Sequence, residues 1–306
     1  MRLAPPALIL WAALSVTATA QTLTAPIGPC EFSPAALAFR GDAREQARCL
    51  LRPYGRWAEL HGELATLPPT LDSVVGRPFA LDRVAVSRAL VEGGVPSDIA
   101  GDAQTQVSFG GPERSIRARY LVLHDTSTPD LGAAPFPDNL DDDEGVNSFH
   151  AYRRRNAVAH AFVNRRGEIY VAQDFAGPLR ATKLERAEYG GRYARGLFLH
   201  LELVQPRRYG DDDPGGRPDN HGIAPDVGFS AQQYRRAAQL YVLASARAGE
   251  WLIPGLHANV DRWIPDAHDD PQNFSLDAFD AALAEVIANI EAESATSDMT
   301  AASPSP

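Results

Sequence analysis

Residues 197–204 form the segment that most restricts how this chain can fold. Leucines occupy every second position from 197 to 203, and Phe198, His200 and Glu202 occupy the positions between them. A period of two places the leucines on one face of a β-strand and the other three side chains on the opposite face. Because a carboxylate is unusual on an otherwise apolar strand, the segment predicts a packed sheet whose second face borders a polar site.

Further segments with the same kind of signal predict the rest of the sheet and its helices. Glycine and proline clusters separate short apolar runs, and a polar Asn-Arg-Arg-Gly sequence joins two of these runs as in a hairpin. Helix signals follow, with a capping box that begins at Ser230 and a glycine at position 249 that can end the helix. The predicted strands are residues 120–124, 161–163, 169–171 and 197–204, and the predicted helices are residues 230–249 and 276–290.

Strands interspersed with amphipathic helices indicate one mixed α/β domain over about residues 113–293. Residues 21–112 are predicted to be a mostly helical N-terminal extension, with helices at residues 34–51 and 81–91. Residues 294–306 are rich in Ser, Thr, Ala and Pro, and we expect a disordered tail there.

The first twenty residues have the features of an export signal. Arg2 precedes a short apolar run at residues 7–16, and Ala18-Thr19-Ala20 resembles a cleavage site. A membrane anchor is the alternative, but the run is short for a bilayer and no other long apolar stretch follows. We therefore predict an exported protein, periplasmic or extracellular, without an integral membrane segment.

Charge and cysteine content narrow the function further. With 39 acidic residues against 29 lysines and arginines, the chain lacks the basic surplus that nucleic-acid phosphates require. Cys30 and Cys49 are the two cysteines, and in an oxidising compartment a disulfide between them is favoured over two buried free thiols. The sequence carries no indication of an oligomeric state.

Three residues have the chemistry and the local setting of zinc ligands. His124 ends a predicted strand, His257 follows a short apolar run after a predicted helix, and Asp270 lies in a polar segment beyond it. A catalytic zinc site takes three protein ligands of this kind and supplies an activated water. Spacing alone does not connect residues this far apart.

Four motifs connect them through a resemblance to a known family. Tyr120-Leu-Val-Leu-His124-Asp-Thr resembles the first zinc motif of the N-acetylmuramoyl-L-alanine amidases of the type-2 amidase and peptidoglycan-recognition-protein superfamily. Residues 159–170 are similar to that family's hairpin, residues 199–203 to its glutamate strand, and His257 with Asp270-Pro271 to its closing segment. The motifs follow in the family's order, and residues 21–112 lie outside them.

The resemblance implies a mixed central sheet flanked by helices and a Zn²⁺ ion held by His124, His257 and Asp270. It implies that Glu202 acts on the attacking water and that His268 supports the oxyanion where several family members have a lysine. The implied reaction is hydrolysis of the amide bond between N-acetylmuramic acid and L-alanine, in peptidoglycan or a muropeptide.

Departures from the family pattern keep several alternatives open. Gln272 stands where the family has a glycine after Asp-Pro, so the loop turns differently. The gap from His257 to Asp270 is slightly longer than in the shortest family members, so Asp269 or His268 can replace Asp270 as the third ligand. His200 replaces a small residue and can contact substrate, whereas His160 is expected to be packed or hydrogen bonded. The alternative functions are a non-catalytic peptidoglycan-binding module and an amidohydrolase acting on a related acylated substrate.

Overall fold

The centre of the fold is a five-stranded mixed sheet. The computed structural model describes residues 30–54, 62–100, 103, 105–107, 109–110, 116–153, 158–186, 194–209, 222–264 and 267–301. The strand order is β7-β6-β8-β5-β9, in which β7 is antiparallel to β6 and the other neighbours are parallel. The strands are β5 (Tyr120–Asp125), β6 (Ala161–Val163), β7 (Ile169–Val171), β8 (Phe198–Leu203) and β9 (Ile253–Leu256). The sheet confirms the predicted α/β class.

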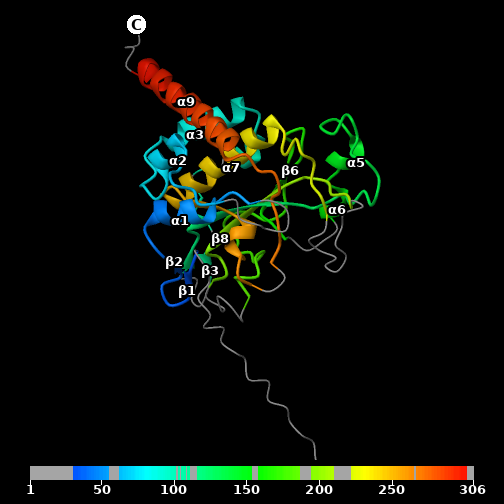
Figure 1. Cartoon of the computed structure of the whole chain (residues 1–306). Helices are drawn as coiled ribbons and strands as arrows, with labels where there is room; N and C mark the ends of the chain where they lie inside the picture. The colour runs from blue at the N-terminus through cyan, green and yellow to red at the C-terminus, as the bar shows by residue number, and fades with distance from the viewer. Residues whose placement is uncertain are drawn as a thin grey trace, which may run out of the picture.

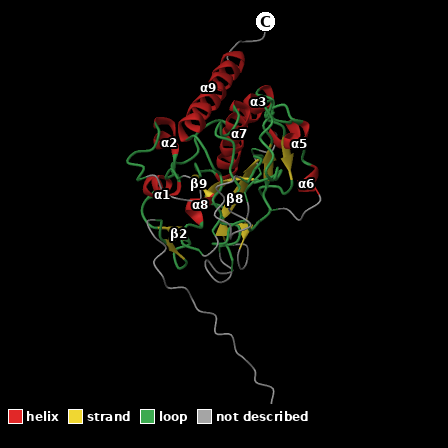
Figure 2. Ribbon diagram, turned by 45° about the vertical axis from the view of Figure 1, so that its right-hand side comes forward, coloured by secondary structure: helices red, strands yellow, loops and turns green. Residues whose placement is uncertain are grey.

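Helices flank this sheet, as Figures 1 and 2 show. Helix α7 (Ala231–Ala248) packs against β6 and β8, and α9 (Leu276–Ala301) packs against α7, α2 (Pro69–Val74) and α3 (Arg83–Glu92). The remaining helices are short: α1 (Ala43–Leu50), α4 (Ser97–Ala100), α5 (Glu144–Asn147), α6 (His150–Arg153) and α8 (His257–Val260). Among the described residues, no helix has the length and apolar character needed to cross a membrane.

The parallel register of β5 and β8 determines which side chains meet on the site-bearing face. Tyr120 lies opposite Phe198, and His124 lies opposite Glu202. The two rings at the amino ends stack with centroids 5.0 Å apart, while the carboxyl ends carry the histidine and the carboxylate. The face is therefore aromatic at its amino end and polar from His200 to its carboxyl end, because the core packs on its first half.

The predicted boundaries of α7 are confirmed by its caps. The Ser230 hydroxyl accepts a hydrogen bond from the Gln233 amide at 3.1 Å, and the Gln233 side chain accepts one from the Ser230 amide at 3.1 Å. Gly249 ends the helix with φ of 78°, a left-handed conformation that glycine adopts without the steric cost of a Cβ.

The N-terminal part differs from its predicted structure at the first helix. Helix α1 begins at Ala43 rather than at residue 34, because the Asp42 carboxylate accepts the amides of Arg44 and Glu45 and starts the helix there. Two short antiparallel pairs occupy this part of the chain: β1 (Phe32–Ser33) with β2 (Ala38–Phe39), and β3 (Phe109–Gly110) with β4 (Ile116–Arg117). The Cys30–Cys49 disulfide is present, as predicted.

This N-terminal part shares one hydrophobic core with the sheet. Leu50 is fully buried beside Gly255 of β9, whose position lies against the leucine side chain. The Asn259 side chain of α8 donates to the carbonyls of Leu50 and Arg52 at 2.9 and 2.8 Å. Residues 30–54 consequently support α8, the helix that begins with His257.

The C-terminal helix is longer than expected. Helix α9 continues to Ala301, so the expectation of disorder from residue 294 is wrong for residues 294–301. The predicted export signal at residues 1–20 lies outside the described residues.

Candidate metal centre

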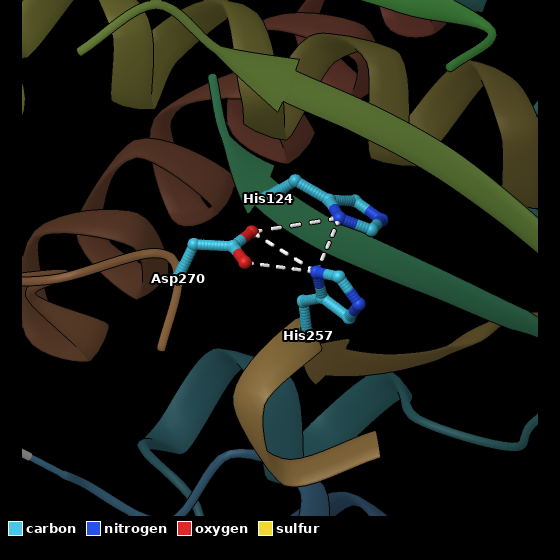
Figure 3. Close-up of side chains that lie close together, drawn as sticks. All are labelled: His124, His257 and Asp270. Carbon is cyan, nitrogen blue, oxygen red and sulfur yellow. Dashed lines mark hydrogen bonds and ion pairs between the residues drawn. The ribbon is translucent and has the colours of Figure 1, made fainter. Parts of the chain in front are cut away.

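The three predicted ligands come from three elements that meet at one edge of the sheet. His124 lies near the carboxyl end of β5, and His257 directly follows β9, its parallel neighbour. Asp270 comes from the segment before α9, which crosses the same edge. Figure 3 shows the two imidazole rings and the carboxylate pointing toward a common centre.

The ligand atoms lie close together and are buried. The Nδ1 atoms of His124 and His257 are 2.9 Å apart. The nearest Asp270 oxygens lie 2.9 Å from His257 Nδ1 and 3.5 Å from His124 Nδ1. All three side chains are at most 5% exposed. Two imidazole nitrogens and one carboxylate are ligands that divalent transition metals accept, so this group can hold a metal ion.

The charges around the three residues also suit a cation. Burial and the neighbouring His257 lower the pKa of His124 to about 3, so its ring is neutral near pH 7. Burial also lowers the pKa of His257, but the carboxylates of Asp270 and Asp261 outweigh it and the net pKa is well above the usual value. Without a metal, His257 therefore carries a second proton on Nδ1, within hydrogen-bond distance of the Asp270 carboxylate.

The structure distinguishes Asp270 from the two alternative third ligands. Asp269 is turned away, because its carboxylate accepts from the Gln272 side chain at 2.6 Å and lies 3.9 Å from Arg207. His268 lies at the rim with 42% of its side chain exposed, and its Nδ1 is 4.0 Å from the nearest Asp270 oxygen. Of the three neighbours, Asp270 is the one whose carboxylate meets both histidines.

His268 stacks on His257 with ring centroids 5.1 Å apart and an angle of 19° between the planes. Burial lowers the pKa of His268 below the usual 6.5, even though Asp270 acts in the opposite direction. This lowered pKa makes the neutral ring the main form at neutral pH. A neutral imidazole still carries one N–H that can donate a hydrogen bond.

Glu202 lies directly opposite His124 in the parallel register of β8 and β5. Its Oε2 is buried and has no hydrogen-bond partner among the described residues. Burial, followed by the carboxylates of Asp270 and Asp125, raises the pKa of Glu202 well above its usual value. An unpaired carboxylate with a raised pKa is suited to accept and return a proton.

These residues share one cavity of about 420 Å³. The cavity is lined by the candidate ligands His124, His257 and Asp270. Glu202, His268 and Arg207 line it as well. Arg207 is not free to bind a ligand strongly, because its guanidinium donates to Asp125 at 2.6 Å and to the Gly222 carbonyl at 3.4 Å. The cavity therefore combines the candidate metal ligands with the Glu202 carboxylate and the partly exposed His268 ring.

The other predicted histidine positions have defined places. His160 is buried, and its ring contacts the Gly177 carbonyl at 3.1 Å and the His200 amide at 3.0 Å, which confirms the packed, hydrogen-bonded reading. His200 does not line the cavity; it lies behind His124 and is fully buried. His61 and His221 lie outside the described residues.

Two buried carboxylates near the site, Glu185 and Asp261, were not singled out from the sequence. Asp261 lies four residues after His257, at the C-cap of the short helix α8, and this spacing was the one available signal. Glu185 lies in an irregular segment whose sequence has no periodic pattern. No family model, curated protein or solved structure matches the chain.

Proposed function

We propose that this chain is a zinc-dependent amidase that hydrolyses the bond between N-acetylmuramic acid and L-alanine in peptidoglycan. The observation that carries the proposal is the convergence of His124, His257 and Asp270 beside Glu202. The Oε2 atom of Glu202 has no hydrogen-bond partner among the described residues. The four motifs that resemble the type-2 amidases favour this bond over other amides. The cavity above the three residues has room for part of a substrate.

Zinc suits the donor set, because catalytic zinc sites combine histidine nitrogens with a carboxylate oxygen. The Nδ1 atoms of His124 and His257 and the carboxylate of Asp270 would hold the ion. When bound, zinc would polarise the scissile carbonyl and lower the pKa of a water molecule.

The protein's own side chains then handle the protons of the reaction. Glu202 takes a proton from the attacking water as the new carbon–oxygen bond forms. It returns this proton to the nitrogen of L-alanine as the carbon–nitrogen bond breaks, so the products are a carboxylic acid and an amine. The acid then releases its remaining proton to the solvent. The N–H of His268, at the rim of the cavity, supports the negative charge that develops on the carbonyl oxygen.

The disulfide supports export to the compartment that contains the substrate. Disulfides persist in oxidising environments such as the periplasm and the cell exterior. The structure contains such a bond between Cys30 and Cys49. The predicted signal at residues 1–20 points to the same location.

A direct test incubates the purified, zinc-loaded protein with peptidoglycan and identifies the products by mass spectrometry. We expect free stem peptides that begin with L-alanine, together with glycan strands that have lost them. Muropeptides that stay intact, from protein shown to contain zinc, would contradict the proposed reaction and favour a binding module.

Zinc affinity is expected to rise with pH by about tenfold per unit while His257 exchanges one proton for the metal. The sign follows from the pKa of His257, which lies well above 6.5 in the metal-free protein. Below this raised pKa, zinc must displace the proton from Nδ1; above it, the dependence levels off. Competition with a zinc chelator at several pH values measures the slope, and an affinity that does not change with pH would contradict the expectation.

A further inference from the structure

Three buried polar side chains lie behind the metal centre, on the side away from the cavity. His200, Glu185 and Asp261 are each at most 1% exposed. Asp261 contacts the ring nitrogen of His257 that faces away from the common centre, and His200 contacts the corresponding nitrogen of His124. Glu185 lies behind His200. Burying charged groups is unfavourable unless they are hydrogen bonded, so their partners indicate what they do.

Asp261 determines which ring nitrogen of His257 carries the proton. The Nε2 of His257 lies 2.9 Å from an Asp261 oxygen. The Asp261 carboxylate also accepts the backbone amides of Lys183 at 2.7 Å and Leu184 at 2.9 Å. An ionised carboxylate can only accept, so the His257 proton resides on Nε2 and its Nδ1 lone pair is free for a metal.

Behind His124, the series of contacts includes one residue more than behind His257. The Nε2 of His124 lies 3.1 Å from the Nδ1 of His200. The Nε2 of His200 in turn lies 3.1 Å from an oxygen of Glu185. His200 Nε2 and Glu185 Oε1 have no hydrogen-bond partner among the described residues, so the contact of Nε2 with Glu185 Oε2 is close but lacks the alignment of a hydrogen bond.

This arrangement assigns a proton to each ring in turn. Glu185 Oε2 already accepts two backbone amides and faces His200 Nε2 as an acceptor. His200 then carries its proton on Nε2 and offers the lone pair of Nδ1 to His124. His124 then donates from Nε2, and its own Nδ1 lone pair is left for the metal. The ring of His160 stacks on His200 at 5.7 Å and accepts the His200 amide at 3.0 Å, which holds His200 in place.

The contacts behind both histidines end at backbone amides of one segment, residues 181–184. Glu185 accepts the amides of Ala181 and Thr182 at 3.0 Å each, and Asp261 accepts the next two amides, as described above. Residues 181–185 thereby hold both carboxylates that act on the candidate ligands.

We propose that residues 181–185 are the positioning element of the metal centre, and that Glu185, His200 and Asp261 are positioning residues that present both Nδ1 lone pairs to the ion. Outer partners of this kind raise metal affinity without touching the metal. The proposal rests on the metal site of the proposed function but not on its substrate.

The test measures zinc affinity by chelator competition in His200→Leu, His200→Asn and Glu185→Gln. We expect His200→Leu and Glu185→Gln to bind zinc about 10–100-fold more weakly than the unaltered protein. His200→Asn should retain most of the affinity, because its amide oxygen can accept from His124 in place of Nδ1. The absorption spectrum of the cobalt-substituted variants reports separately whether the ligand set is altered.

Asp280→Asn is the matched control. Asp280 is a buried carboxylate that accepts the Leu71 and Thr70 amides at 2.7 and 3.2 Å, and it belongs to α9 rather than to the site. This variant can lose stability but should keep its zinc affinity. Circular dichroism of the metal-free proteins separates unfolding from loss of metal.

Unchanged zinc affinity in a folded His200→Leu or Glu185→Gln protein would overturn the proposal, as would equal losses in His200→Asn and His200→Leu. If His200→Leu does not fold, the comparison of His200→Asn with Glu185→Gln decides. Zinc binding that follows the expected order, without cleavage of peptidoglycan, would refute the proposed reaction and leave this inference standing.

Discussion

Replacing Glu202 with glutamine is expected to lower the rate of amide hydrolysis by about 10²–10⁴-fold while zinc stays bound. Glutamine has nearly the same shape but cannot accept the proton of the attacking water. Because Glu202 Oε2 has no hydrogen-bond partner among the described residues, the change breaks no contact described there for that atom. The turnover rate on a defined muropeptide, measured together with the zinc content of the protein, checks the prediction.

Glu285→Gln provides the matched control for this change. Glu285 lies on α9 with 55% of its side chain exposed, where it pairs with Arg235 at 3.2 Å. Exposed pairs of this kind contribute little to stability, so activity should be unchanged. If Glu202→Gln kept a substantial part of the activity, another group would have to act as the base.

Replacing Asp270 with alanine is expected to remove zinc binding and, with it, hydrolysis. The loss should exceed the about 10–100-fold weakening that follows removal of an outer partner. Asp270 is the carboxylate that meets both histidines, with oxygens 2.9 Å from His257 and 3.5 Å from His124. Its removal also leaves the two Nδ1 atoms facing each other without the carboxylate that contacts both of them. Zinc titration followed by calorimetry measures the loss.

Two further variants make the prediction specific. Asp269→Ala should keep its zinc, because Asp269 is paired with Gln272 and Arg207 instead. Asp270→Cys should recover zinc binding in part, since a thiolate is also a zinc ligand. Strong zinc binding in Asp270→Ala, with loss in Asp269→Ala, would transfer the role of third ligand to Asp269.

The position of His200 in the structure differs from the role that its place in the motif suggested. From the sequence, a large residue in place of a small one suggested a contact with substrate. In the structure, its ring lies behind His124 and within 3.1 Å of Glu185. The side chain alternates to the correct face of β8, but its depth below the cavity depends on how residues 181–185 pack over it.

Patterns that depend on near neighbours could be predicted from the sequence alone. The alternation in β8, the hairpin of β6 and β7, and the capping box at Ser230 each involve interactions within a few residues. The same local logic failed for α1, where the capping box at Asp42 overrides the helix expected from residue 34. The candidate ligands were found through ordered motifs, which identify residues but not distances.

The sequence by itself therefore determined the fold class, the disulfide partners and the residue types available for a metal. Only the tertiary structure decided that Asp270, rather than Asp269 or His268, meets both histidines, and that Glu185 and Asp261 stand behind them. The physical reason is that convergence depends on the register of β5, β8 and β9 and on the course of two loops. Contacts between residues 124, 200 and 185, or between 257, 261 and 183, leave no periodic pattern along the chain.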